Sequence, residues 1–399
     1  GFVLTKFVVN NRSLLEGVPV EHLAKEVHEF SDCSVGRALG IQWNVYEDTF
    51  LYSVNVHVSE PLTRRVMLKF VSSVFDPLGL SAPWVLPGRL LLQAATRLRL
   101  DWDDEVGEEI SSLWANWMHG LQCLVEQYFA RCLISEPFAG GYFEFHTFCD
   151  ASQSAYGACI YLRCVSAQGQ VVTNLVAAKA HVAPLKQQTV PRLELQAAHL
   201  GAQLATSVST HLGLSMTPVY YWTDSRIVLA YITSDSRRFK TFVANRVGVI
   251  RSLSESGDWG YVPSGENPAD MLTKSRTVDH VLWKHGPDWL RVNQPFWCRQ
   301  NAPSYFVSDD DPEISKAVLL SHAGDLGSNW TDEMVQRFSA WTGFIRAVAW
   351  VLRFLSYLSA KGKRSSVVVG PLTASEISEA QKMVIRHVQR KLYPAECNG

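Results

Sequence analysis

The chain has 399 residues, of which 47% are hydrophobic and 19% are charged, a composition that is typical of folded protein and excludes wholesale disorder. Its formal net charge is −1, so any contact with nucleic acid must come from local basic patches. The 8 cysteines include no C-x-x-C pair, which argues against a zinc ribbon or a disulfide scaffold and favours a reducing, intracellular compartment.

The first 140 residues are predicted to contain short strands followed by helices. Residues 1–60 show strand-like alternation around a turn at Asn44 to Asp48, and residues 61–140 show mainly helical periodicity. The stretch "FDPLGLSAPWVLPGR" interrupts the helical pattern with Pro and Gly. Asp101, Asp103 and Asp104 resemble a metal site, but acids at the start of a helix are the preferred interpretation.

Residues 141–290 have an ordered series of predicted elements. Three strands come first, then a helix from Pro191, and then strands that alternate with helices. The predicted strands are 143–149, 156–163, 171–178, 217–224 and 258–262, and the helices are 191–212, 225–232, 239–256 and one that starts at 269. Hairpins followed by strand–helix alternation predict an α/β (α+β) fold with a mixed five-stranded sheet and flanking helices.

The last 100 or so residues are predicted to form a linker and helices. Helices are expected at 331–359 and 375–392, and Thr373 with Glu376 forms a capping-box pattern. The apolar stretch 338–358 contains Arg346 and Arg353 on one helical face. These charges favour a packed amphipathic helix over a membrane span.

Four carboxylates occupy the ends of the predicted elements. Asp150 ends the first strand, Asp224 ends the fourth, Glu194 lies in the first turns of the long helix, and Asp270 begins the last helix. If the first and fourth strands are central neighbours, these acids converge and repel one another. Mg²⁺ prefers such oxygen ligands, and two ions about 4 Å apart can hydrolyse a phosphodiester. Singly, each acid is better explained as a helix cap or a solvated residue.

The motifs around these acids resemble the ribonuclease H domain of BEL/Pao-type LTR retrotransposon polyproteins. They read "TFCDAS", "VAPLKQQTVPRLELQAA", "YYWTDSRIVLAYI" and "YVPSGENPADMLTKS". The resemblance implies hydrolysis of the RNA strand of RNA/DNA hybrids, with two Mg²⁺ ions (Mn²⁺ as an alternative). It also implies that Asp150 bridges both ions, Glu194 and Asp224 complete one site, and Asp270 completes the other.

The resemblance extends over nearly the whole chain. It implies the end of a reverse-transcriptase palm/thumb over 1–60, a helical connection region over 61–140, the ribonuclease H-like domain over 141–290, and a linker towards integrase over 291–399. The expected partners are the RNA/DNA hybrid and the rest of the Pol polyprotein, including the reverse-transcriptase palm and integrase. The expected location is a cytoplasmic particle, the nucleus or both, without a membrane.

Several departures from the family pattern bear on activity. The polymerase motif Y-x-D-D is absent. The family's middle part often carries an aspartic peptidase label, yet no D-[ST]-G signature is present. Tyr261 stands where relatives often have histidine, and His285 is a weak substitute that is better read as a surface residue. A non-catalytic nucleic-acid scaffold and a peptidase therefore remain as alternatives.

The sequence also suggests residues that contact the substrate. A basic-aromatic cluster contains Arg237, Arg238 and Lys240 around Phe239, and Arg192 lies beside Glu194. A solvated loop with Phe239 packed on the core explains the cluster equally well. The remaining candidates are short polar residues adjoining the acids, for which turn and cap chemistry is the alternative: Ser152, Ser225 and Asn267.

Overall fold

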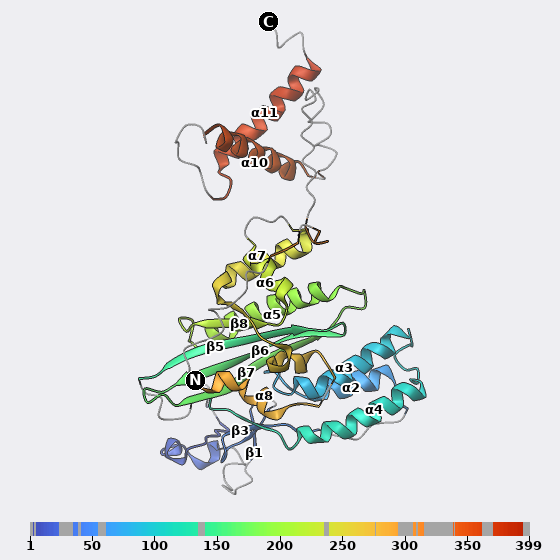
Figure 1. The fold of residues 1–399 in the computed structure, drawn as a ribbon, viewed down its shortest axis with the longest axis vertical. Coiled ribbons are helices and arrows are strands. Elements are labelled where there is room, and N and C mark those ends of the chain that lie inside the picture. The colour runs from blue at the N-terminus through green and yellow to red at the C-terminus, as the bar shows by residue number, and fades with distance from the viewer. Residues whose placement is uncertain are drawn as a thin grey trace. The chain divides into compact units, whose positions relative to one another are not determined.

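We describe a computed structural model of the chain (Figure 1). It describes residues 3–393, except 4, 24–34, 39–40, 55–60, 135–139, 235–238, 276, 294–305, 309, 315–337, 339 and 361–369. The chain divides into two compact units, Gly1–Lys316 and Ala317–Gly399. Each unit is described by itself.

A mixed five-stranded sheet is the centre of the first unit. Its strands are β5 (Tyr142–Ala151), β6 (Ala155–Val165), β7 (Val171–Val182), β8 (Val219–Thr223) and β9 (Trp259–Tyr261). The order is β7-β6-β5-β8-β9, with β5, β6 and β7 antiparallel and β8 and β9 parallel to their neighbours. The predicted fold class is therefore confirmed, and the first and fourth predicted strands are central neighbours.

Three helices cover one face of this sheet. They are α5 (Val190–His211), α6 (Arg226–Thr233) and α7 (Thr241–Leu253), and Figure 1 shows them on the same side. Their buried residues share a core with Phe145, Ile160 and other residues of the sheet. A Cβ atom added at Gly201 would lie 2.3 Å from the sulfur of Cys149, so this glycine permits α5 to approach β5 closely.

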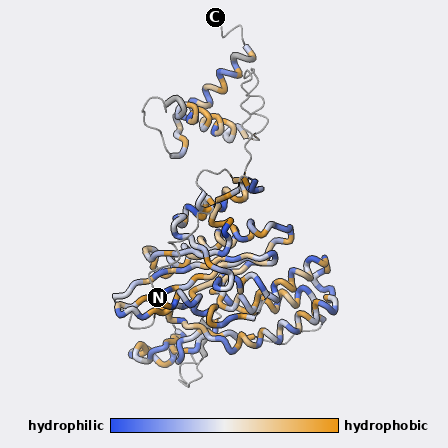
Figure 2. Tube along the Cα trace, viewed as in Figure 1, coloured by the Kyte–Doolittle hydropathy of each residue, from blue (hydrophilic) through white to orange (hydrophobic). Residues whose placement is uncertain are grey.

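Three helices that precede the sheet in sequence and one that follows it cover its other face. They are α2 (Arg64–Ser73), α3 (Ala82–Arg97) and α4 (Glu108–Leu121), together with α8 (His280–His285). Residues from all four pack in one core with Phe148 and Tyr161 of the sheet. The turn before α3 contacts β7 directly, because Ala178 N donates to the carbonyl of Leu78 at 2.8 Å. Figure 2 shows hydrophobic and hydrophilic residues alternating along the helices, as expected when one side of each packs on a core.

A small antiparallel sheet contains the N-terminal strands. It comprises β1 (Val35–Ala38), β2 (Ile41–Asn44), β3 (Thr49–Leu51) and β4 (Tyr128–Ala130) in that order. The turn predicted at Asn44 to Asp48 joins β2 and β3. Short 3-10 helices occur at Arg12–Leu15, Val20–His22, Gln122–Leu124, Ser256–Asp258, Ser264–Glu266, Pro268–Leu272 and Asp288–Arg291.

The acids at 101–104 do not start a helix, which corrects the prediction. They lie in a turn, and α4 begins only at Glu108. Asp103 accepts two hydrogen bonds from Arg65 of α2, at 2.7 and 2.9 Å, and Asp104 accepts one from the backbone of Asp101. These acids therefore stabilise a turn.

The second unit contains a helix pair, α10 (Trp341–Ala360) and α11 (Ala374–Leu392). The predicted capping box of Thr373 and Glu376 is present at the start of α11. Arg353 of α10 donates to Glu376, which links the two helices across a core that includes Phe344 and Val384. None of the helices in the described ranges is long and apolar enough to cross a membrane.

Candidate active site

Asp150 and Asp224 lie side by side at one edge of the sheet. Strands β5 and β8 run parallel, and their last paired residues are Cys149 and Thr223. The next residue of each chain is one of the two aspartates. Because neighbouring strands are about 4.8 Å apart, the two carboxylates are close neighbours, as the sequence predicts. Asp150 is buried, whereas Asp224 is partly exposed.

Glu194 reaches the same edge from α5. Its carboxylate accepts a hydrogen bond of 2.6 Å from the hydroxyl of Ser225, the residue that follows Asp224. Ser225 is also the N-cap of α6, and its hydroxyl accepts from the backbone of Val228. Ser225 was predicted to contact substrate, but its side chain is buried. It positions Glu194 next to Asp224 instead.

Asp270 lies on a 3-10 helix, Pro268–Leu272, and not on the α-helix that the sequence suggested. Asn267 fixes this helix to the end of β5, because its side-chain amide donates to the carbonyl of Cys149 at 3.1 Å. The same side chain caps the helix by accepting from Ala269 N. Asn267 is fully buried, so it holds Asp270 near Asp150 and does not face a substrate.

Burial and mutual repulsion perturb these carboxylates. The pKa of Asp150 is raised from 3.8 to about 7, mainly by burial and then by the negative charge of Asp224, with a smaller contribution from Asp270. Hydrogen bonding from Thr273 and the charge of Lys274 oppose this rise. Burial, and then the charge of Asp224, also raise the pKa of Glu194 against the hydrogen bond from Ser225. The four acids therefore act on one another electrostatically.

Lys274 is a member of the cluster that the sequence analysis missed. Its ammonium forms an ion pair with Asp270, one helical turn earlier in the chain. The pKa of Lys274 is raised mainly by the hydrogen bond to Asp270, and the charges of Asp150 and Asp224 raise it further. The spacing of four residues in "ADMLTK" was the available signal, because side chains so spaced can meet within one turn. Lys274 supplies a positive charge within this acidic site.

The donor set fits divalent cations by its chemistry. All four predicted residues provide carboxylate oxygens, which Mg²⁺ prefers, and a cation would offset the burial and the carboxylate charges that raise the pKa of Asp150. In the arrangement described, each carboxylate has a polar partner, including hydroxyl donors from Thr273 to Asp150 and from Ser264 to Asp224. Among the described residues, no three Asp, Glu, His or Cys side chains form a ready metal-binding group.

Ser152 has a structural role in the turn between β5 and β6. Its hydroxyl donates to the carbonyl of Thr273 at 2.7 Å and accepts from the backbone of Ser154 and Ala155. Turn chemistry therefore accounts for this residue, and its bond to Thr273 connects the turn to the segment that bears Asp270.

Arg192 makes a bidentate ion pair instead of lying free beside Glu194. Its guanidinium donates to Glu313 at 2.6 and 3.0 Å, and it stacks over the ring of Phe242. Lys240 is exposed, and its backbone donates to the carbonyl of Glu313. Phe239 packs against the core, as in the alternative interpretation. Arg237 and Arg238 lie outside the described residues.

Tyr261 stands where relatives often have histidine, and His285 is the other candidate for that role. Tyr261 ends β9 on the sheet edge that carries the acids, and Arg226 lies over its ring. His285 contacts Thr173 near the start of β7, where the strands align with Glu144 and not with Asp150. Six residues of strand, about 20 Å, separate these two levels of the sheet. His285 therefore packs at the opposite end of the sheet, where it is half-buried and is not the surface residue that the sequence suggested.

Solved structures of two ribonucleases H and of one reverse transcriptase are similar to parts of this chain. Ribonuclease H1 from the archaeon Halobacterium salinarum is 18% identical, and the match covers 33% of this chain and 93% of that one, with a TM-score of 0.24. LC11-RNase H1 in complex with an RNA/DNA hybrid is 13% identical over 33% and 92% of the chains, with a TM-score of 0.24. Foamy viral protease-reverse transcriptase in complex with dsDNA is 12% identical over 61% and 46%, with a TM-score of 0.20. No curated protein matches.

A family model matches the part of the chain that contains most of the site. The family is described as a Pao retrotransposon-like RNaseH-like domain, and it matches residues 63–225. This range includes α2, α3 and α4 together with three of the four acids, Asp150, Glu194 and Asp224. The resemblance to Pao-type retrotransposon polyproteins is thereby confirmed: residues 63–225 match the model of the Pao retrotransposon-like RNaseH-like domain.

Proposed function

We propose that this chain is a segment of a BEL/Pao retrotransposon Pol polyprotein whose ribonuclease H-like domain hydrolyses the RNA strand of RNA/DNA hybrids during reverse transcription. The observation that carries the proposal is the convergence of Asp150, Glu194, Asp224 and Asp270 at one sheet edge. Burial and then the charges of Asp224 and Asp270 raise the pKa of Asp150, and burial and then the charge of Asp224 raise that of Glu194.

The four carboxylates are the proposed ligands of Mg²⁺. Bound Mg²⁺ would lower the pKa of an attacking water and neutralise charge on the leaving oxygen. The chain itself contributes the fixed positions of the ligands. Ser225 orients Glu194, and Asn267 holds the Asp270 segment against β5. Lys274 provides a positive charge that can meet a phosphate oxygen of the substrate when it leaves Asp270, because half of its side chain is exposed.

Cleavage by the whole chain tests this proposal. A labelled RNA/DNA hybrid is incubated with the chain and Mg²⁺, and the products are separated by gel electrophoresis. The isosteric change Asp224→Asn removes one ligand charge and should reduce cleavage by about 100-fold or more, since a metal ligand supports several kcal/mol of transition-state stabilisation. Hybrid binding should persist. Glu126→Gln, at an exposed position outside the cluster, is the matched control and should cut like the parent.

The same experiment distinguishes the alternatives. If the parent binds the hybrid but neither it nor the control cuts, the chain is a scaffold that holds nucleic acid. A peptidase is not supported by the surroundings of Asp224, because the next residue, Ser225, caps α6 and bonds to Glu194. Cleavage of DNA/DNA and hybrid duplexes at equal rates would also contradict the proposal, since only the hybrid presents 2′-hydroxyls on the cut strand.

A further inference from the structure

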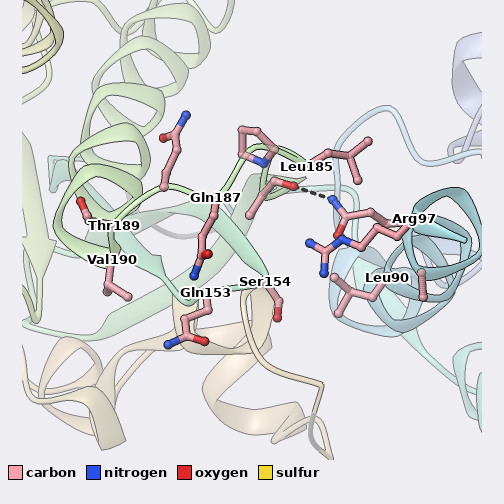
Figure 3. Close-up of a pocket in the computed structure, with 13 residues that line it drawn as sticks. Leu90, Arg97, Gln153, Ser154, Leu185, Gln187, Thr189 and Val190 are labelled. Carbon is pink, nitrogen blue, oxygen red and sulfur yellow. Dashed lines mark hydrogen bonds between the residues drawn. The ribbon is translucent and has the colours of Figure 1, made fainter.

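A cavity of about 870 Å³ lies beside the acidic site, between the helical layer and the loops at the edge of the sheet. Helix α3 provides one wall, the β5–β6 turn provides the second, and the loop from β7 to α5 provides the third. Figure 3 shows Arg97 extending from α3 towards the cavity, with Gln153 and Ser154 from the turn and Gln187 from the loop.

The cavity shares the edge of the sheet that carries the carboxylates. The turn residue Gln153 comes three residues after Asp150, and Thr189 of the loop comes five residues before Glu194. In register, Asp150 pairs with Gly157, which pairs with Ala180 of β7. The end of β7 is therefore two strands, about 10 Å, from Asp150.

Helix α3 is fixed to this end of β7 by two side chains. Gln93 donates to the carbonyl of Ala183 at 2.5 Å, and Arg89 donates to the carbonyl of Ala180 at 3.3 Å. These bonds place the C-terminal turn of α3, which bears Arg97, above the cavity. The position of this wall is fixed by packing, because α3 also contributes residues to the hydrophobic core on that face of the sheet.

The lining of the cavity suits an anion that also has hydrogen-bonding groups. It offers the guanidinium of Arg97, the amides of Gln153, Gln187 and Gln188, and the hydroxyls of Ser154 and Thr189, and no carboxylate lines it. Arg97 is exposed and has no acidic partner among the residues that the structure describes. A sugar–phosphate backbone matches this set, because most protein contacts to nucleic acid join Arg, amide and hydroxyl groups to phosphate and sugar oxygens.

Further positive charge lies near the same wall. The pKa of His181 is lowered by desolvation first and then by the charges of Lys179 and Arg89. Lys179 and Arg89 thus add positive charge near the end of β7, and such local charge is what a chain with a net charge of −1 requires to bind a polyanion.

We propose that this cavity binds the sugar–phosphate backbone of the substrate duplex next to the cleavage site, with Arg97 contacting a phosphate and the glutamine amides contacting sugar and phosphate oxygens. The inference rests on the proposed nuclease function and extends it, because it assigns a substrate-binding role to the helical layer that precedes the sheet. The shared ligand chemistry is a phosphodiester, from either the DNA or the RNA strand.

Hybrid binding by the whole chain at several salt concentrations tests the assignment. Binding is measured by fluorescence anisotropy with Asp224→Asn as the background, so that the hybrid stays intact. Arg97→Ala should reduce the steepness of log affinity against log salt by about 0.9, which corresponds to one phosphate contact. The loss of affinity caused by Arg97→Ala should therefore be about eightfold larger at 0.1 M salt than at 1 M salt. Arg97→Lys should restore most of the slope. Arg65→Ala, which also removes one charge but does not line the cavity, should leave the slope unchanged.

Hybrids with a single neutral methylphosphonate identify the strand. When the phosphate that Arg97 contacts is the neutral one, binding of the hybrid by the Asp224→Asn chain should weaken. Binding by the same chain with Arg97→Ala added should not change. The strand that carries this position is the one held in the cavity. Suppose that the chain without substitutions binds and cleaves the hybrid, but that Arg97→Ala leaves the salt slope unchanged. This result would overturn the cavity assignment alone. Failure of the parent chain to bind any hybrid would overturn the nuclease proposal as well.

Discussion

Asp150→Asn should make the metal-free protein more stable at neutral and alkaline pH. Asp150 is only 3% exposed, and burial with the neighbouring Asp224 and Asp270 raises its pKa from 3.8 to about 7. This change corresponds to about 4 kcal/mol of unfolding free energy. Asparagine keeps the shape and can still accept the hydrogen bond from Thr273, but it carries no charge.

The sign of the effect depends on pH. Below about pH 4 the carboxyl group is protonated in both the folded and the unfolded chain, so parent and variant should be equally stable. Between pH 4 and 7 the unfolded carboxyl ionises while the folded one resists, and the parent progressively loses stability. Above pH 7 the parent bears the full cost, and the variant should be more stable by up to about 4 kcal/mol.

Urea unfolding in EDTA, followed by tryptophan fluorescence at pH 4, 6 and 8, measures this difference. Glu126→Gln, an exposed change outside the cluster, should show no such pH-dependent gain. Adding Mg²⁺ should stabilise the parent more than the variant, because a bound ligand favours the folded state. A variant that is equally or less stable than the parent at pH 8 would refute the electrostatic reasoning.

Two further substitutions test the packing of the fold, one at the contact between β7 and the turn before α3 and one at the end of the sheet away from the site. Gly79→Ala should destabilise the fold by at least about 2 kcal/mol, since Gly79 has a φ of +74° and an added Cβ would lie 1.8 Å from the carbonyl oxygen of Ala178. Gly120→Ala, with nothing within 4 Å, is the control and should be neutral or stabilising by up to about 1 kcal/mol in thermal unfolding. Arg163→Met should cost about 3–5 kcal/mol, because it removes the 2.8 Å ion pair of buried Glu144 and leaves only the longer contact of 3.5 Å with His146. Adding Glu144→Gln should recover part of that loss, and no recovery would contradict the pairing.

The positions of the strands along the chain and most of the acidic cluster could be predicted from the sequence because the signals are local. Period-2 alternation identifies β5 to β7, and Pro191 marks the start of α5 within one residue of its position. Asp150 and Asp224 end strands, and parallel neighbours necessarily bring such ends together. The residue types and their places in the elements thus predicted that these two carboxylates meet if their strands are neighbours, and the strand order of the sheet meets that condition.

Contacts between distant segments depend on the tertiary structure alone. Arg192 reads as a free cation beside Glu194, but it pairs with Glu313 from far along the chain. The sequence suggests that Asn267 and Ser225 contact the substrate, but both side chains are buried and hydrogen-bonded so that they position the acids.

The sequence by itself determined which side chains could form an acidic site, because the periodicity of each segment and the chemistry of its end residues are encoded locally. Only the tertiary structure decided what surrounds that site: the Lys274 ammonium beside Asp270, and the α3 wall that carries Arg97. The physical reason is that packing of helices on both faces of one sheet selects the neighbours, and no short stretch of sequence records that choice.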